Sequence, residues 1–346
     1  MTNHRMSLIS LAMASLMGCS NEDTPRISQE QAQLLVQGVA EQQLSIAVQN
    51  FSEDTEELAT AAKTHCVAPS EATLVDLRLA WATASQAWYQ LQLFNFGPAT
   101  ADIVFPEFTF IDSLRLRGTD YTETILTTQE NWLNSDEVLT AEFFSELRFQ
   151  YVGLLSTEVS FFAEDGVAVA TGEDDRICQI AMGLSTELAS RAEELRAGWL
   201  EPNGDSGASY LELLVDNELP DGRDHLVALL LAGWEYADYL EKRSVVTVAG
   251  QLSQTSWSLL AASVGSLRKL LEEEQEGKSI VSLMQEMGAN ADATELGVIL
   301  SDLSEAVEKE DVLGLNSSLA SLVHFFRSEI PLALGIDLGL TITDGD

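Results

Sequence analysis

The chain has 346 residues, of which 55 are acidic and 18 are basic, so its formal net charge is −37. Its length exceeds that of one usual hydrophobic core and favours two domains of ordinary size. Such an acidic composition excludes nucleic acid as a partner and excludes adhesion of the body to anionic lipid, because both would need a basic surface. It suits a solvated acidic surface, or else cations or cationic partners.

The first 18 residues predict a secretory signal peptide. Arg5 precedes an apolar run that ends at Met17, and small Gly18 follows. This order of charge and apolar residues is typical of export signals, and the run is too short to span a membrane.

A lipid anchor is predicted at Cys19. The letters LMGC at residues 16–19 resemble a bacterial lipobox, in which the cysteine is lipidated and becomes the mature N-terminus. Residues 19–27 would then form an anchored linker. Ser20 stands where an aspartate would favour the inner membrane, so for a Gram-negative host we expect an outer-membrane anchor and a periplasmic body.

Two further cysteines, Cys66 and Cys178, follow Cys19. In an exported protein such a pair predicts a disulfide, worth about 4 to 5 kcal/mol on a chain-entropy argument. A metal site with two cysteines is the alternative, although no further thiol exists to complete it.

Apolar residues at helical spacing predict helices through the first half. The first begins at a capping box from Ser28 to Gln31. The second carries Trp81 and Trp88, which share a face seven residues apart and indicate bundle core or, less simply, the wall of a cavity. Alternating apolar residues at 103–110 allow some extended structure. The expected helices are 28–66, 71–94, 121–134, 138–162 with a break near Phe149, and 174–200.

The second half follows the best domain boundary in the chain, the letters EPNGDSGAS at 201–209. Its expected helices are 209–217, 223–242, 251–274, 292–307 and 311–334. The pattern predicts an all-α protein of two helical bundles side by side, about four helices each, at 28–202 and 203–346.

Signatures of common catalytic chemistry are missing from the sequence. It contains neither G-x-S-x-G nor a glycine-rich phosphate loop. Glu235 and Asp238 could chelate a cation, but an ion pair of Asp238 with Lys242 is the alternative. No H-E-x-x-H or Glu-x-x-His pattern includes any of the three mature histidines, His65, His225 and His324.

A single acidic residue, Glu158, interrupts the apolar segment RFQYVGLLSTEVSFF. In a helix it shares a stripe with Tyr151, Leu155 and Phe162. A buried carboxylate is costly unless it is paired, hydrogen-bonded, metal-bound or protonated. We therefore expect Glu158 to be buried and to accept a hydrogen bond from another helix, with Gly153 permitting close helix approach.

Four segments together resemble the imelysin-like proteins, a family named for an insulin-cleaving membrane protease. DLRLAWATASQAWYQLQLFNFGP contains the family's two tryptophans and F-G-P, here Trp81, Trp88, Gly97 and Pro98. RFQYVGLLSTEVSFF resembles its G-L-x-x-x-E segment. DDRICQIAMGLSTELASRAEELRAGWL resembles its cysteine-bearing helix, and IPLALGIDLGLTITDGD its closing segment.

The resemblance implies an all-α fold of two bundle-like halves, export with frequent lipid anchoring, and a link to iron uptake or binding. Members with a G-x-H-x-x-E motif were proposed as metallopeptidases. That motif aligns on Gly153, Leu155 and Glu158, so leucine stands in place of the histidine. Some members also carry an arginine and a glutamate where this chain has Ser85 and Gln92.

Three functional hypotheses follow. The first is a non-enzymatic, lipid-anchored envelope protein that binds iron or another divalent metal with Glu158 as a ligand, or that binds a component of iron uptake. The second is a metallopeptidase that uses Glu158. The third is a scaffolding lipoprotein in which Glu158 is hydrogen-bonded across the bundle interface.

Overall fold

The computed structural model describes residues 26–101, 106–114, 119–163, 175–202, 207–242 and 249–340. Over these ranges the fold is all-α, and the only β-type pairing is an isolated bridge between Gln275 and Lys278. The predicted signal peptide, Cys19 and the closing DGD lie outside the described residues. Within the same ranges, no helix is both long and apolar enough to cross a bilayer.

The first helical run extends from Gln29 to Val67, as the sequence predicts. The Ser28 hydroxyl accepts a hydrogen bond from the Gln31 amide at 3.2 Å, and the Gln31 side chain accepts one from the Ser28 amide at 3.0 Å, which completes the capping box. A π-helical segment that the sequence did not indicate lies inside the run. Its parts are α1 (Gln29–Val39), η1 (Ala40–Leu44) and α2 (Ser45–Val67).

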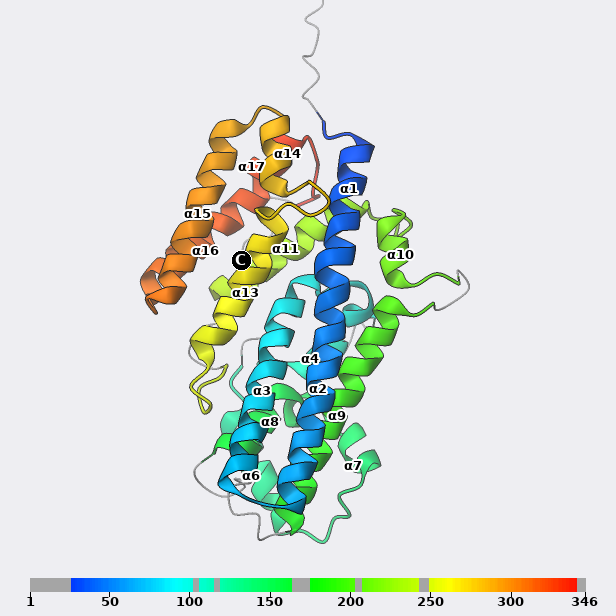
Figure 1. Cartoon of the computed structure of the whole chain (residues 1–346), viewed down its shortest axis with the longest axis vertical. Helices are drawn as coiled ribbons and strands as arrows, with labels where there is room; N and C mark the ends of the chain where they lie inside the picture. Colours follow the sequence, from blue (N-terminus) through cyan, green and yellow to red (C-terminus); the bar gives the residue numbers. More distant parts are fainter. Residues whose placement is uncertain are drawn as a thin grey trace, which may run out of the picture.

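Helices α2 to α9 form an N-terminal group, in the lower part of Figure 1. Its frame is α2 packed against α3 (Glu71–Leu91) and α9 (Asp175–Leu200). The shorter elements around this frame are η2 (Gln92–Phe94), η3 (Gly97–Thr100), α4 (Glu107–Ile111), α6 (Thr122–Leu133), α7 (Ala141–Ser145), η4 (Phe149–Tyr151) and α8 (Gly153–Phe162).

Helices α10 to α17 form a C-terminal group, whose main part lies in the upper left of Figure 1. Helix α16 packs against both α11 and α15. Helix α1 lies beside this group, where the Gln31 side chain donates to Glu286 at 2.7 Å. The elements are α10 (Tyr210–Val215), α11 (His225–Lys242), α13 (Ser256–Leu271), α14 (Ile280–Glu286), α15 (Asn290–Glu308), α16 (Val312–Arg327) and α17 (Glu329–Leu334).

The two groups share one hydrophobic core. Helix α13 packs against α3, and α11 packs against η2. A single cluster of buried apolar side chains therefore includes residues from Ala32 in α1 to Leu338 beyond α17. The division at residues 202 and 203 stays a prediction.

One sequence expectation needs correction, one is confirmed, and one helix was missed. Residues 107–110 are helical rather than extended, because Pro106 stands at the N-cap of α4 and Phe108 faces the core. The break expected near Phe149 is confirmed, because the helical region at 138–162 is divided into α7, η4 and α8. Helix α14 was not predicted, although Ser279 caps it and Ile280 and Leu283 are buried.

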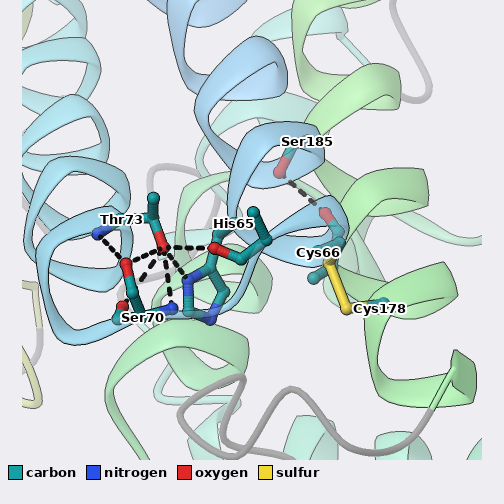
Figure 2. The surroundings of a disulfide bond; sticks show 8 residues. His65, Cys66, Ser70, Thr73, Cys178 and Ser185 are labelled. Atoms are coloured by element: carbon teal, nitrogen blue, oxygen red, sulfur yellow. Dashed lines mark hydrogen bonds between the residues drawn. A yellow bond between two sulfur atoms is a disulfide. The ribbon is translucent and has the colours of Figure 1, made fainter.

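The predicted disulfide between Cys66 and Cys178 is confirmed. It joins the end of α2 to the start of α9, with 5.5 Å between the Cα atoms. Figure 2 shows the imidazole of His65 pointing away from the sulfur atoms, and its Nδ1 atom lies 2.9 Å from the Thr73 hydroxyl. The alternative of a metal site with two cysteines is thereby excluded.

Candidate functional site

Helix α8 is almost wholly buried, and neighbouring helices form hydrogen bonds with its serine and threonine residues. From α6, the Gln129 side chain donates to the Ser156 carbonyl at 3.0 Å and accepts from the Ser160 hydroxyl at 3.0 Å. From α3, the Trp81 indole donates to the Thr157 hydroxyl at 3.0 Å. These bonds fix the orientation of α8 and hence of Glu158.

Glu158 is buried, as predicted, with 1% of its surface exposed. Its Oε1 atom accepts hydrogen bonds from the Ser253 amide at 2.9 Å and from the Ser253 hydroxyl at 2.8 Å. Ser253 lies in the turn before α13, so the donor belongs to the C-terminal group but to a turn rather than to a helix. Because α8 starts only at Gly153, Tyr151 is not on the same helical stripe, contrary to the expectation.

Burial raises the pKa of Glu158 above its ordinary value, because an ionised carboxylate loses its hydration. The hydrogen bonds from Ser253 act in the opposite direction and lower the pKa, as do the backbone groups of Gly250 and Leu252. Desolvation is the largest of these effects, so the pKa is raised overall.

A small cavity of about 20 Å³ lies beside Glu158, between the two groups of helices. Helix α3 supplies one wall, α8 a second, and the segment before α13 a third. The lining residues are Trp81, Ser85, Tyr89, Asp112, Leu114, Leu154, Leu155, Glu158, Ala249, Gly250 and Leu259. The structure therefore places Trp81, Leu155 and Glu158 around one space.

Asp112, directly after α4, is a second buried carboxylate that lines this cavity, and it was not among the predicted site residues. It accepts hydrogen bonds from the Gln92 side chain at 2.6 Å, the Trp88 indole at 3.4 Å and the Leu114 amide at 3.1 Å. Together with burial, the charge of Asp112 raises the pKa of Tyr89 well above its ordinary value. Its signal in the sequence is a lone aspartate in the apolar stretch FTFIDSL.

Gly97 and Pro98 lie in a different place from Glu158. Gly97 has a φ of +56° and sits under the ring of Tyr210, where an added Cβ would come within 2.5 Å. Both residues line an open groove of about 700 Å³ between η3, α9 and α10. The F-G-P segment therefore does not contribute to the cavity beside Glu158.

Gly153 permits the close approach that the sequence suggested. Its φ is +81°, and an added Cβ would lie 2.4 Å from the Ile111 carbonyl oxygen and 2.5 Å from that of Phe110. The close contact is therefore with the backbone at the end of α4.

Gly153→Ala should lower the free energy of unfolding by about 2 to 3 kcal/mol, because left-handed backbone and a forced backbone shift both cost energy. Urea denaturation would measure this loss. The matched control is Gly265→Ala on α13, where an added Cβ meets nothing within 4 Å. The control should gain about 0.5 to 1 kcal/mol. Equal midpoints for the two variants would contradict the assigned role of Gly153.

The described residues do not fit a metal centre at Glu158. None of them form a group of three His, Cys, Asp or Glu side chains placed to hold an ion. Leu155 offers no lone pair and packs against Ile125 and Val159. The proposed metal ligand role of Glu158 therefore stays a prediction. Elsewhere, Asp238 forms its ion pair with Lys242 at 2.8 Å.

Comparisons with known proteins point to one family. A family model described as Imelysin, a peptidase family, matches residues 47–315. An imelysin-like protein from Psychrobacter arcticum 273-4 has a similar structure, with a TM-score of 0.70 and 20% identity over 91% of this chain and 98% of that one. No curated protein matches the sequence.

A second solved structure is a candidate iron-regulated protein A precursor from Parabacteroides distasonis ATCC 8503. It matches with a TM-score of 0.64 and 15% identity, over 90% of this chain and 95% of that one. At these identities the two likenesses establish a shared fold.

Proposed function

The chain belongs to the imelysin family, and on that premise we propose that it is an exported, lipid-anchored binding protein of the bacterial envelope, linked to iron uptake and without peptidase activity. The proposal rests mainly on the residues that this chain has at the positions of the G-x-H-x-x-E motif. Leu155 stands where the histidine would be, and Glu158 is buried and tied to Ser253.

A general base must reach both a water molecule and the substrate at hydrogen-bond distance. The carboxylate of Glu158 has 1% exposure and faces a cavity of about 20 Å³, which has no room for a peptide bond and its flanking residues. These features argue for a structural use of Glu158, which joins α8 to the C-terminal group of helices.

The iron link is supported by the name of the structural neighbour described as iron-regulated, and by the family resemblance. The described residues around Glu158 do not supply a set of metal ligands. Our first candidate is therefore that the protein binds another component of iron uptake. The second candidate is that Glu158 binds iron or another divalent ion. Its only support is that the glutamate of the motif is retained in this chain. A nucleic-acid partner is disfavoured by the net charge of −37.

A strain that lacks the gene should grow poorly in iron-depleted medium and take up less radioactive iron than its parent. Wild-type protein and Glu158→Gln should both restore uptake, because the amide keeps an oxygen that Ser253 can donate to. Cys19→Ser should fail to restore it, because the protein would no longer be held at the membrane.

Three results would overturn parts of this proposal. A Glu158→Gln protein that is present at the wild-type level but restores no uptake would return a chemical or metal role to the carboxylate. Cleavage of unfolded casein by the purified protein that is lost both with chelator and in Glu158→Gln would establish a peptidase. Normal iron uptake without the gene would remove the iron link.

A further inference from the structure

The hydroxyl group of Ser85 is buried without a hydrogen-bond partner among the described residues. Its side chain is on α3, has 0% exposure and lines the cavity beside Glu158. A buried hydroxyl group without a partner costs free energy, and in native proteins such a group usually has an ordered water or an ion beside it.

The dimensions of the cavity limit what can satisfy Ser85. A space of about 20 Å³ exceeds the roughly 10 to 15 Å³ that one water molecule needs, and it is too small for an organic ligand. The cavity walls are apolar at Trp81, Leu154 and Leu155. The polar side chains that line it besides Ser85 are those of Tyr89, Asp112 and Glu158, so few groups can serve as partners.

Glu158 is the partner with spare capacity. A carboxylate has about four lone-pair sites. Both hydrogen bonds from Ser253 go to Oε1. The backbone groups of Gly250 and Leu252 also lie close enough to act on the carboxylate, but they are weaker than Ser253 as donors, so acceptor capacity is left at Oε2. An ionised carboxylate in a desolvated site gains from each further donor.

We propose that this cavity is a binding site for one water molecule, which donates to Glu158 Oε2 and is hydrogen-bonded to Ser85 Oγ. The water completes a chain of hydrogen bonds from α3, through Ser85 and Glu158, to Ser253 in the C-terminal group. It couples the two groups of helices at a point where apolar packing alone has left a gap. This inference is independent of the iron link proposed above.

The direction in which Ser85→Ala changes the stability distinguishes a hydrated cavity from a dry one. In a dry cavity Ser85→Ala removes an unsatisfied hydroxyl group, so the protein should become more stable. In a hydrated cavity Ser85→Ala removes a partner of the bound water, so the melting temperature and the urea midpoint should both fall. Ser301→Ala, at an exposed position of α15, is the control for the higher helix propensity of alanine.

Two measurements complete the test. A crystal structure of the wild-type protein should show a density peak within about 3.2 Å of both Ser85 Oγ and Glu158 Oε2. In the Ser85→Ala protein, NMR titration should show the pKa of Glu158 moving upward, because the ionised form has lost a positioned donor.

The proposal requires the density peak together with a midpoint for Ser85→Ala below that of Ser301→Ala. A cavity without the peak, or a Ser85→Ala protein at least as stable as its control, would overturn it.

Discussion

A double variant, Cys66→Ser with Cys178→Ser, should lose about 4 to 5 kcal/mol of unfolding free energy relative to the wild-type protein. The disulfide closes a loop of 112 residues, and in the chain-entropy model a loop of about 100 residues is worth close to this amount. The effect arises mainly in the unfolded chain, which gains conformational freedom when the link is removed. Urea denaturation at neutral pH would measure it.

The native contacts around the link should survive its removal. Ala62 in α2 and Ala181 in α9 are fully buried in the same core, so the ends of the two helices remain packed without the sulfur atoms. Reductant should therefore lower the midpoint of the wild-type protein to that of the double variant and leave the variant unchanged. A double variant with the wild-type midpoint would contradict the entropic role.

The disulfide also bears on where the protein works. Structural disulfides persist in oxidising compartments, which include the bacterial periplasm, and are rare in the cytosol. A link worth this much stability therefore supports the proposed export, on grounds separate from the pattern of the first 18 residues.

Local sequence patterns were sufficient to predict most helices. The capping box at Ser28 and the apolar periodicity after it identified the run that ends at Val67. The break before α8 was harder to place, because Gly153 starts that helix at a positive φ and accommodates carbonyl groups of Phe110 and Ile111, more than 40 residues earlier. This constraint is non-local, and the glycine is its only sign in the local sequence.

The candidate site was predictable only in part, for the same reason. A lone glutamate on an apolar stripe predicted the burial of Glu158, since helical spacing is a local property. The donor could not be found, because Ser253 is 95 residues away in a turn. Asp112 and Ser85 were missed as members of the site, because the cavity that joins them to Glu158 is formed only when α3, α8 and the turn before α13 come together.

Glu158→Ala should lower the unfolding free energy by about 2 to 4 kcal/mol. The change leaves the partly buried amide of Ser253 without its acceptor, a loss of about 1 to 3 kcal/mol, and enlarges the cavity. Thermal and urea denaturation would measure the loss. Glu158→Gln is the matched control, because it keeps the volume and one acceptor oxygen, and it should stay within about 1 kcal/mol of the wild type.

The comparison of wild type with Glu158→Gln should also depend on pH. Burial raises the pKa of Glu158 in the folded protein above the ordinary value of 4.5, so the folded state binds the proton more tightly than the unfolded state. The stabilising effect of protonation is fully present below pH 4.5 and is lost as the pH rises through the folded pKa. The glutamine side chain does not titrate. The other carboxyl groups contribute equally to the stability of both proteins, so their effect cancels when the two proteins are compared. The unfolding free energy of the wild type minus that of Glu158→Gln should therefore decrease from pH 4 to pH 8. A difference that stays constant or increases with pH would show that the hydrogen bonds from Ser253 outweigh desolvation.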